Sequence, residues 1–243
     1  MADVSALNIE IIEEPRCRVH RFRYVSDKRK PGPVTGVNTT EGNKSYPKIR
    51  IAGLKTTAKI RVSCVTADAP YRVHPNELAR PRDKSWSGII EGLIVPPSEI
   101  YELKGVGVIS TLKEHFAEAY DRRRELHVDP FNQGYDHIES DIDSKIIRLC
   151  FEADVLDSSG SRCLRTLTPV VSGPIFHCKR TSRKYDIHKL EPETVSMTGG
   201  MKLKIFGTSN WPDDFKVRFQ YMGGGGMWER IVDPLPRQGG DPS

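Results

Sequence analysis

The sequence predicts an all-β protein with two immunoglobulin-like β-sandwich modules in tandem, the first with an inserted helix and the second truncated. Short segments in which apolar and polar residues alternate recur along the chain, separated by turns rich in Gly, Pro and Asn. This pattern is typical of β-sandwiches. Residues 112–126 break the alternation with helical spacing. At 243 residues the chain has room for one large domain or two ordinary ones.

Strands are expected wherever the period-two alternation is clear. We expect them at residues 6–14, 48–52, 58–65, 103–109, 146–156 and 162–167 of the first module, and at 201–207 and 215–221 of the second. Residues 31–43 are expected to form a loop, and the Pro-rich, basic residues 69–87 a surface connection.

The segment 112–126 is the one expected helix. Leu112, Phe116 and Tyr120 recur near helical spacing among good helix formers. Its run Arg122–Arg124 favours a solvated helix end, with cations well placed against the helix dipole, over a nucleic-acid contact.

The two modules are expected to divide after residue 177. Residues 178–184 are short, basic and without apolar periodicity, as a linker is. The first module then spans 1–177 and the second 185–243, which is shorter than the roughly 100 residues of a complete module. Residues 234–243 have the composition of a disordered tail.

Composition narrows the class of function. The net charge of +5 and pI of about 8.9 favour a polyanionic partner. No apolar run approaches the ~18 residues of a membrane span, so no membrane role is expected. Five cysteines at irregular spacing, without Cys-x-x-Cys, indicate a reducing compartment and neither a disulfide framework nor a zinc site.

Catalytic chemistry is not expected. The seven histidines are scattered, and no nucleophile-elbow motif is present. The acidic residues Glu139, Asp141 and Asp143 lack the spacing of a calcium loop and favour a solvated loop. The run Gly223–Gly226 lacks a following Lys-Ser or Lys-Thr and is expected to be a turn. We therefore expect no enzyme activity, metal or cofactor.

The basic stretch of residues 16–30 carries the functional signal. Arg21, Arg23 and Arg29 each offer a planar fork of donors, which is the geometry that reads guanine O6 and N7. Tyr24 adds a flat face, and Asp27 an acceptor for a cytosine amino group. A purely phosphate-binding arm would gain nothing from that carboxylate. On these residues alone, a solvated basic edge strand is an equal alternative.

The segment Arg21–Asp27, Arg-Phe-Arg-Tyr-Val-Ser-Asp, resembles the recognition loop of the Rel homology region, found in the nuclear factor kappa B, Rel and Dorsal transcription factors. That family's loop reads Arg-Phe-Arg-Tyr-x-Cys-Glu. Further matches follow in order at Ser45–Ile49, His74–Leu78, Ile147–Phe151 and Pro169–Phe176. The resemblance implies a DNA-binding first module and a second module that carries dimerisation.

The resemblance also implies which residues act. Ser26 stands where the family has a redox-sensitive Cys, and Asp27 replaces the family's Glu with a shorter reach. Ser110 and Thr111 stand where the family has paired lysines, for which Lys113 compensates in part. DNA contacts are implied at Arg21, Arg23, Tyr24, Ser26, Asp27, Arg29, Lys113, Lys179 and Arg180. Dimer-interface positions are implied at Ile187, His188, Lys189 and Lys204.

Three hypotheses follow. The leading one is a sequence-specific transcription factor that reads G-rich, kappa-B-like sites in double-stranded DNA as a homo- or heterodimer with Rel-family subunits. The family implies immune or developmental signalling, location in nucleus and cytoplasm, and an ankyrin-repeat inhibitor as a further partner. The second is a truncated Rel form that acts as a heterodimer partner or competitor with weak DNA binding of its own. The third is an immunoglobulin-fold binding module without a DNA role.

Overall fold

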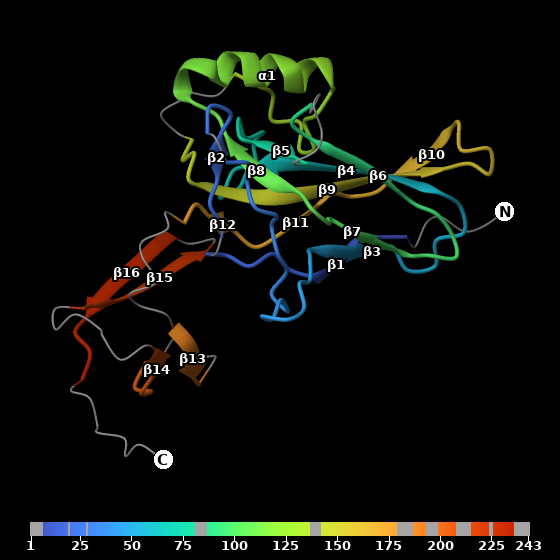
Figure 1. Cartoon of the computed structure of the whole chain (residues 1–243). Helices are drawn as coiled ribbons and strands as arrows, with labels where there is room; N and C mark the ends of the chain where they lie inside the picture. The colour runs from blue at the N-terminus through green and yellow to red at the C-terminus, as the bar shows by residue number, and fades with distance from the viewer. Residues whose placement is uncertain are drawn as a thin grey trace. The chain divides into compact units, whose positions relative to one another are not determined.

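The computed structural model describes residues 7–18, 20–27, 29–80, 87–136, 142–178, 187–192, 199–207, 215–223 and 226–235. The chain divides into two compact units, Met1–Lys179 and Arg180–Ser243 (Figure 1). Strands dominate both units, and no helix in the described parts of the chain is long and apolar enough to cross a membrane.

The strands of the first unit form three sheets. Their bounds are β1 (Glu10–Glu13), β2 (Arg23–Tyr24), β3 (Lys48–Arg50), β4 (Ala58–Val65), β5 (Glu77–Ala79), β6 (Ile90–Ile94), β7 (Ile100–Glu102), β8 (Gly107–Ser110), β9 (Ile146–Leu156), β10 (Cys163–Thr166), β11 (Val170–Val171) and β12 (Ile175–Phe176). One sheet has the order β1-β3-β7, a second β2-β8-β5, and the largest β10-β9-β4-β6, with β11 and β12 also paired to β9.

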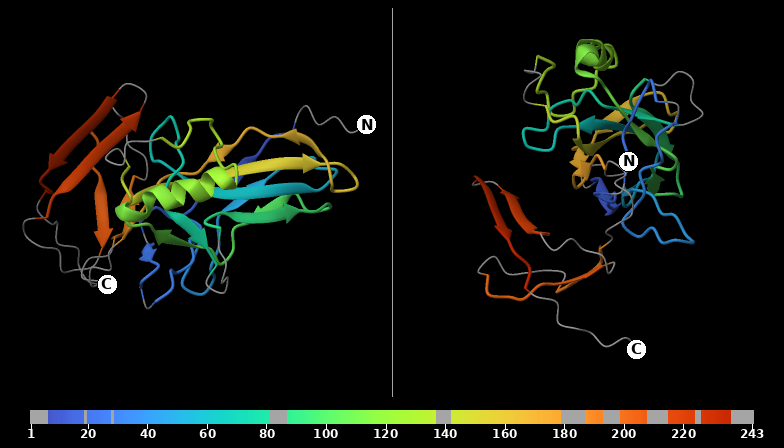
Figure 2. Two further views of the ribbon diagram at one scale, coloured as in Figure 1. Left: turned by 90° about the horizontal axis from the view of Figure 1, so that it is seen from above. Right: turned by 60° about the vertical axis from the view of Figure 1, so that its left-hand side comes forward.

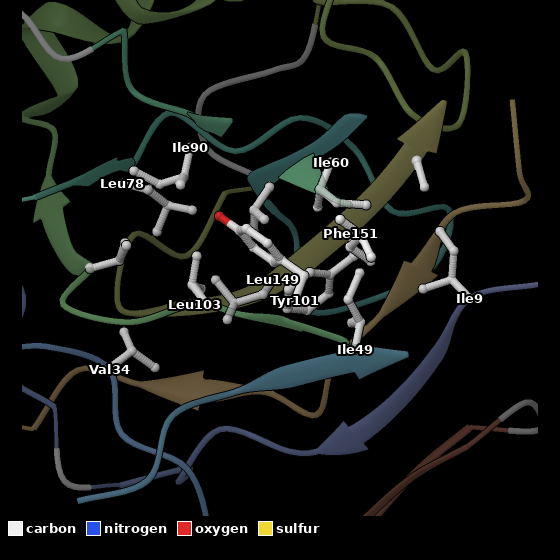
Figure 3. Close-up of a cluster of buried hydrophobic side chains, with 14 of the residues drawn as sticks. Ile9, Val34, Ile49, Ile60, Leu78, Ile90, Tyr101, Leu103, Leu149 and Phe151 are labelled. Atoms are coloured by element: carbon white, nitrogen blue, oxygen red, sulfur yellow. The ribbon is translucent and has the colours of Figure 1, made fainter. Parts of the chain in front are cut away.

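The long strands β4 and β9 pair antiparallel over the whole of β4, from Ala58 opposite Val155 to Val65 opposite Arg148. Their alternation turns Ile60 and Val62 into the core, where neither is exposed, while the charged residues between them face outward. The same core takes Phe151 from β9, Ile49 and Leu78 from the other two sheets, and Leu103 from the segment after β7 (Figure 3). Each such side chain contributes about 1.5–3 kcal/mol by burial.

The helix lies along one side of the first unit, over β5 and β8 (Figures 1 and 2). It begins as the 3-10 turn η1 (Lys113–His115) and continues as α1 (Phe116–Glu125), so the helix expected at 112–126 is confirmed. Phe116 and Tyr120 pack with Val73 and Ile142 in a second apolar cluster. The buried Arg123 donates hydrogen bonds to the carbonyls of Ser87, Asn76 and Gly88 at 3.0–3.2 Å.

Three expectations for the first unit are wrong. The solvated helix end expected at Arg122–Arg124 does not hold for Arg123, which is buried because its guanidinium bonds to three backbone carbonyls. The strand expected at 103–109 is interrupted by a turn at Gly105, whose φ is +72°, so that β7 ends before it and β8 begins after it. The expected surface connection at 69–87 contains the buried strand β5. Its polar neighbours His74 and Asn76 are buried as well, because their side chains bond to the carbonyls of Asp143 and Ser144.

The second unit contains, within its described residues, two antiparallel strand pairs. The strand β13 (Ile187–Glu191) pairs with β14 (Lys204–Gly207), and β15 (Val217–Gly223) pairs with β16 (Gly226–Val232). Strands thus lie where residues 201–207 and 215–221 predict them. Gly223 pairs with Gly226 at the turn of the second hairpin. Residues 193–198, 208–214 and the tail 236–243 lie outside the described residues.

Candidate nucleic-acid interface

The recognition segment, which we define as residues 16–30, contributes an edge strand to the sheet β2-β8-β5. The strand β2 runs parallel to β8, with Arg23 opposite Ile109 and Tyr24 opposite Ser110 (Figure 1). Because parallel strands end at the same edge of a sheet, the residues after Tyr24 and those after Ser110 leave the sheet together. This arrangement brings the turn 24–27 to the same edge as the start of the helical segment at Lys113.

A tight turn at residues 24–27 presents the tip of the segment to solvent. The backbone N–H of Asp27 donates to the Tyr24 carbonyl at 3.0 Å. The Asp27 carboxylate in return accepts the Tyr24 N–H at 3.2 Å and lies 3.8 Å from the Arg23 guanidinium. Tyr24 is 41% exposed and Val25 66%, and Ser26 is exposed too. The acceptor that the sequence assigns to cytosine is thus engaged within the turn.

Phe22 anchors the recognition segment, because its side chain is only 2% exposed and packs in the main core. The Phe22 N–H donates to Nδ1 of His177 at 3.1 Å, and the two rings lie 5.3 Å apart at an angle of 53°. Since neighbouring side chains of an extended chain point to opposite sides, burial of Phe22 turns Arg21 outward, where it is exposed. Arg23, which begins β2, is partly exposed.

The start of the recognition segment lies beside the last residues of the first unit and is hydrogen-bonded to them. The Phe176 N–H donates to the Cys17 carbonyl at 2.7 Å, and the Cys178 N–H to the His20 carbonyl at 2.8 Å. The Arg18 guanidinium lies 4.7 Å from the centre of the Phe176 ring, within cation–π range. The described chain therefore reaches the edge of the linker beside the recognition segment.

The end of the segment returns to the core. Arg29 is exposed, and Pro31 is buried against Gly107, where a Cβ atom would come within 2.7 Å of the Pro31 ring. The Val34 N–H donates to the Val106 carbonyl at 2.7 Å. Gly107 thus permits the close approach that closes the segment against β8.

Thr111 is held inward, whereas Lys113 points to solvent. The Thr111 hydroxyl donates to the Pro75 carbonyl at 2.7 Å, and its N–H to Oδ1 of Asn76 at 3.1 Å. Ser110 is only 8% exposed. Lys113 is exposed in the 3-10 turn, so it is the cation that this side of the interface offers.

The remaining predicted positions lie in the linker and in the second unit. Lys179 and Arg180 lie outside the described residues, as does the rest of the linker. Ile187, His188 and Lys189 lie in β13, for which the structure describes the backbone pairing with β14 and not these side chains. Lys204 pairs with Glu191 at the end of this ladder and is exposed.

Two histidines beneath the segment were missed by the sequence reasoning. His20 is 6% exposed and forms an isolated parallel bridge with His177. Burial lowers the pKa of His20 to about 4, so that it is neutral at physiological pH. The signal that could have found His20 is the alternation itself, because it shares the parity of the buried Phe22. No comparable signal exists for His177, 155 residues away.

The residues that the structure describes hold no group of three or more His, Cys, Asp or Glu side chains that could bind a metal ion. The acidic positions Glu139 and Asp141 lie outside those residues. Cys64 and Cys150 are buried, and burial raises the pKa of both thiols, to about 12 for Cys64. The arrangement at the recognition segment is therefore one of exposed cations and an aromatic ring on a fixed edge, which suits binding to a polyanion.

The chain is similar in sequence to known proteins that are much longer than it. Dorsal, the embryonic polarity protein of Drosophila melanogaster, is 33% identical over 228 residues, which are 93% of this chain and 23% of that protein. The putative transcription factor p65 homologue of Xenopus laevis is 30% identical over 222 residues, which are 91% of this chain and 41% of that protein. The chain thus spans less than half the length of these relatives.

A solved structure described as the Dorsal homologue Gambif1 bound to DNA has a TM-score of 0.67 and 34% sequence identity, covering 71% of this chain and 99% of that one. The expected all-β, immunoglobulin-like fold with an inserted helix is confirmed by this likeness and by the strands and helix described above. The family model described as the Rel homology DNA-binding domain matches residues 9–178, well over half of the sequence. The chain belongs to the Rel homology family.

Proposed function

We propose that the chain is a sequence-specific DNA-binding transcription factor of Rel or Dorsal type, which reads a G-rich, kappa-B-like half-site as a dimer. One observation carries the proposal: Arg23 and Tyr24 form an edge strand, Arg21 is exposed just before it, and the turn that follows is exposed at the same sheet edge as Lys113. Family membership and the likeness to a Dorsal homologue bound to DNA support it.

Each side chain has a role that fits its exposure. Arg21 and Arg23 can each donate two hydrogen bonds to guanine O6 and N7 in the major groove. Tyr24 supplies a face and a hydroxyl for the backbone. Ser26, Arg29 and Lys113 are exposed and suit phosphate contacts. Lys179 and Arg180, which follow Cys178 in the sequence, are proposed as further phosphate contacts.

The domain plan is part of the proposal. Residues 1–177 would bind DNA, 178–184 would link the modules, and 185–243 would dimerise. Ile187, His188, Lys189 and Lys204 are the proposed interface positions. Each subunit of such a dimer reads half of a site, so pairing multiplies both affinity and discrimination. We place the protein in the nucleus and cytoplasm, without enzyme activity, regulating RNA polymerase II transcription in immune or developmental signalling, with an ankyrin-repeat inhibitor as a further partner.

A second candidate is a heterodimer partner or competitor with weak DNA binding of its own. The inward position of Ser110 and the hydrogen bond from Thr111 to Pro75 favour it, because these residues bring no charge to the interface. Each missing phosphate contact reduces counterion release, so the affinity falls and its dependence on salt becomes weaker.

Fluorescence anisotropy on a G-rich kappa-B-type duplex and a scrambled duplex tests the proposal. We expect the wild type to prefer the G-rich duplex, and Arg21→Ala and Arg23→Ala each to lose about 1–3 kcal/mol of that preference. Lys55→Ala is the matched control, since it removes an exposed cation from the loop between β3 and β4. Equal binding to both duplexes, unchanged by either arginine substitution, would refute base readout.

A further inference from the structure

The contact between Phe22 and His177 joins the recognition segment to the end of the first unit. The Phe22 N–H points at Nδ1 of His177 at 3.1 Å, and the rings pack at 5.3 Å. The His177 backbone is itself fixed, because its N–H donates to the Lys145 carbonyl at 2.7 Å at the start of β9. The imidazole therefore connects the segment to the largest sheet.

The direction of this hydrogen bond determines a protonation state. A backbone N–H is a donor, so Nδ1 must be the unprotonated nitrogen of a neutral imidazole with its hydrogen on Nε2. In the imidazolium both nitrogens carry hydrogens. Protonation would then set two donors against each other at 3.1 Å, and the contact would have to open.

We propose that His177 is a positioning residue that holds the recognition segment in its DNA-reading geometry while neutral and releases it when protonated. Phe22 lies between Arg21 and Arg23, so the anchor fixes the backbone of both proposed guanine-reading residues at once. This inference deepens the proposed function and rests on it for its DNA readout. Its structural readout, the hydrogen bond of the Phe22 N–H, does not depend on DNA.

Charged and titratable side chains lie on both segments that contact His177. The recognition segment carries Arg16, Arg18, Arg21 and Arg23, and Lys145 immediately precedes β9. The Asp143 carboxylate accepts the Lys145 N–H. His20 titrates only near pH 4 because it is buried. Histidine is the side chain that ordinarily changes charge between pH ~5 and ~8, and we assign that change here to His177 because its Nδ1 accepts the Phe22 N–H.

The test compares the wild-type chain with two variants, His177→Asn and His177→Leu, at pH 8.0 and pH 5.5. In His177→Asn the side-chain amide oxygen can replace Nδ1 as acceptor without titrating. In His177→Leu the acceptor is removed while an apolar contact with Phe22 remains. Anisotropy with the G-rich duplex measures affinity, and NMR hydrogen exchange of the Phe22 amide measures the anchor. Circular dichroism at each pH confirms that every chain stays folded.

We expect the wild type to bind about five- to tenfold more weakly at the lower pH, the factor to which loss of one hydrogen bond corresponds, with faster exchange at Phe22. His177→Asn should keep high affinity and slow exchange at both pH values. His177→Leu should bind weakly and exchange fast at both. General effects of pH on the fold or on DNA are common to all three chains and cancel in the comparison.

The inference is overturned if His177→Asn follows the wild-type pH profile, or if His177→Leu binds and exchanges like the wild type at pH 8.0. Failure of the proposed function has a different signature: the wild type would then show no preference for the G-rich duplex at either pH. In that case the exchange of the Phe22 amide still decides whether His177 is the anchor.

Discussion

Asp27 offers a sharp prediction, because the structure gives its carboxylate a role within the turn. Oδ2 accepts the Tyr24 N–H at 3.2 Å and lies 3.8 Å from Nη1 of Arg23, with the two side chains 32% and 18% exposed. We therefore expect Asp27 to act through Arg23, by orienting its guanidinium, and not by direct contact with a base.

The magnitude follows from these two contacts. A hydrogen bond of this kind contributes about 0.5–1.5 kcal/mol, and an exposed ion pair no more than about 1 kcal/mol. The turn keeps its backbone bond from Asp27 to Tyr24 in any variant. Asp27→Ala should thus reduce the free energy of binding to the G-rich duplex by about 0.5–1 kcal/mol, less than the loss expected for Arg23→Ala.

A double-mutant cycle decides between the two roles. If Asp27 acts through Arg23, Asp27→Ala should change little in the Arg23→Ala background, which gives a coupling of about 0.5–1 kcal/mol between the two positions. Asp27→Asn, which keeps the acceptor for Tyr24 and loses the charge, should lie between wild type and Asp27→Ala. Anisotropy on duplexes with and without the half-site cytosine measures both. Additive losses that vanish on the duplex without that cytosine would refute the argument and establish direct base contact.

Two further predictions concern the fold that supports this site. Gly88→Ala should lower the free energy of unfolding in urea by more than about 2 kcal/mol, because at φ +82° its Cβ would come within 2.3 Å of the Arg123 guanidinium. The control Gly105→Ala lies at φ +72° with open space around it and should lower the same free energy by only about 1 kcal/mol. Equal losses in the two variants would contradict the packing argument. Burial lowers the pKa values of His74 and His20 to about 4, so below pH ~6.5 the unfolded chain binds more protons than the folded one. The Tm should therefore be constant above pH ~6.5 and fall steadily towards pH 4. A Tm that does not change between pH 6.5 and 4.5 would contradict this prediction.

The sequence predicted best those elements whose signal is local. Residues 58–65 and 146–156 were expected as strands and are β4 and β9 with the same bounds, because regular alternation and flanking turns specify them. The segment 103–109 failed for the opposite reason: Gly105 lies at a positive φ between two short strands, and an alternating pattern continues across the turn. Local periodicity alone does not reveal such an interruption.

Local sequence patterns did not predict which polar side chains are buried. His74 and Asn76 read as loop residues, yet they are fully covered. Asn76 is satisfied by partners far along the chain, with its amide donating to Ser144 and its carbonyl oxygen accepting from Thr111. Such residues are stable inside only when those partners are present. Their positions therefore depend on tertiary structure, which a pattern search does not contain.

The candidate site divides in the same way. Exposure of Arg21 and Tyr24 follows from the motif, but the parallel pairing of β2 with β8 does not. That pairing joins Tyr24 to Ser110, 86 residues further along the chain, and places Lys113 at the shared edge. The bond from Phe22 to His177 spans 155 residues. The chemical role of each side chain could be predicted from the sequence. Which of these side chains lie together on one surface could be seen only in the folded structure.

The charges of the recognition segment alone would not hold it in one conformation. A run of cations repels itself and gains little from an edge strand of two residues. The described contacts distribute the anchoring: Phe22 in the core, the carbonyls of Cys17 and His20 bound by the end of the first unit, and Pro31 against Gly107. Fixing the segment before it meets DNA removes ordering entropy from the binding step. Because one anchor, His177, can lose its acceptor to a proton, the same feature that orders the segment also makes its order adjustable.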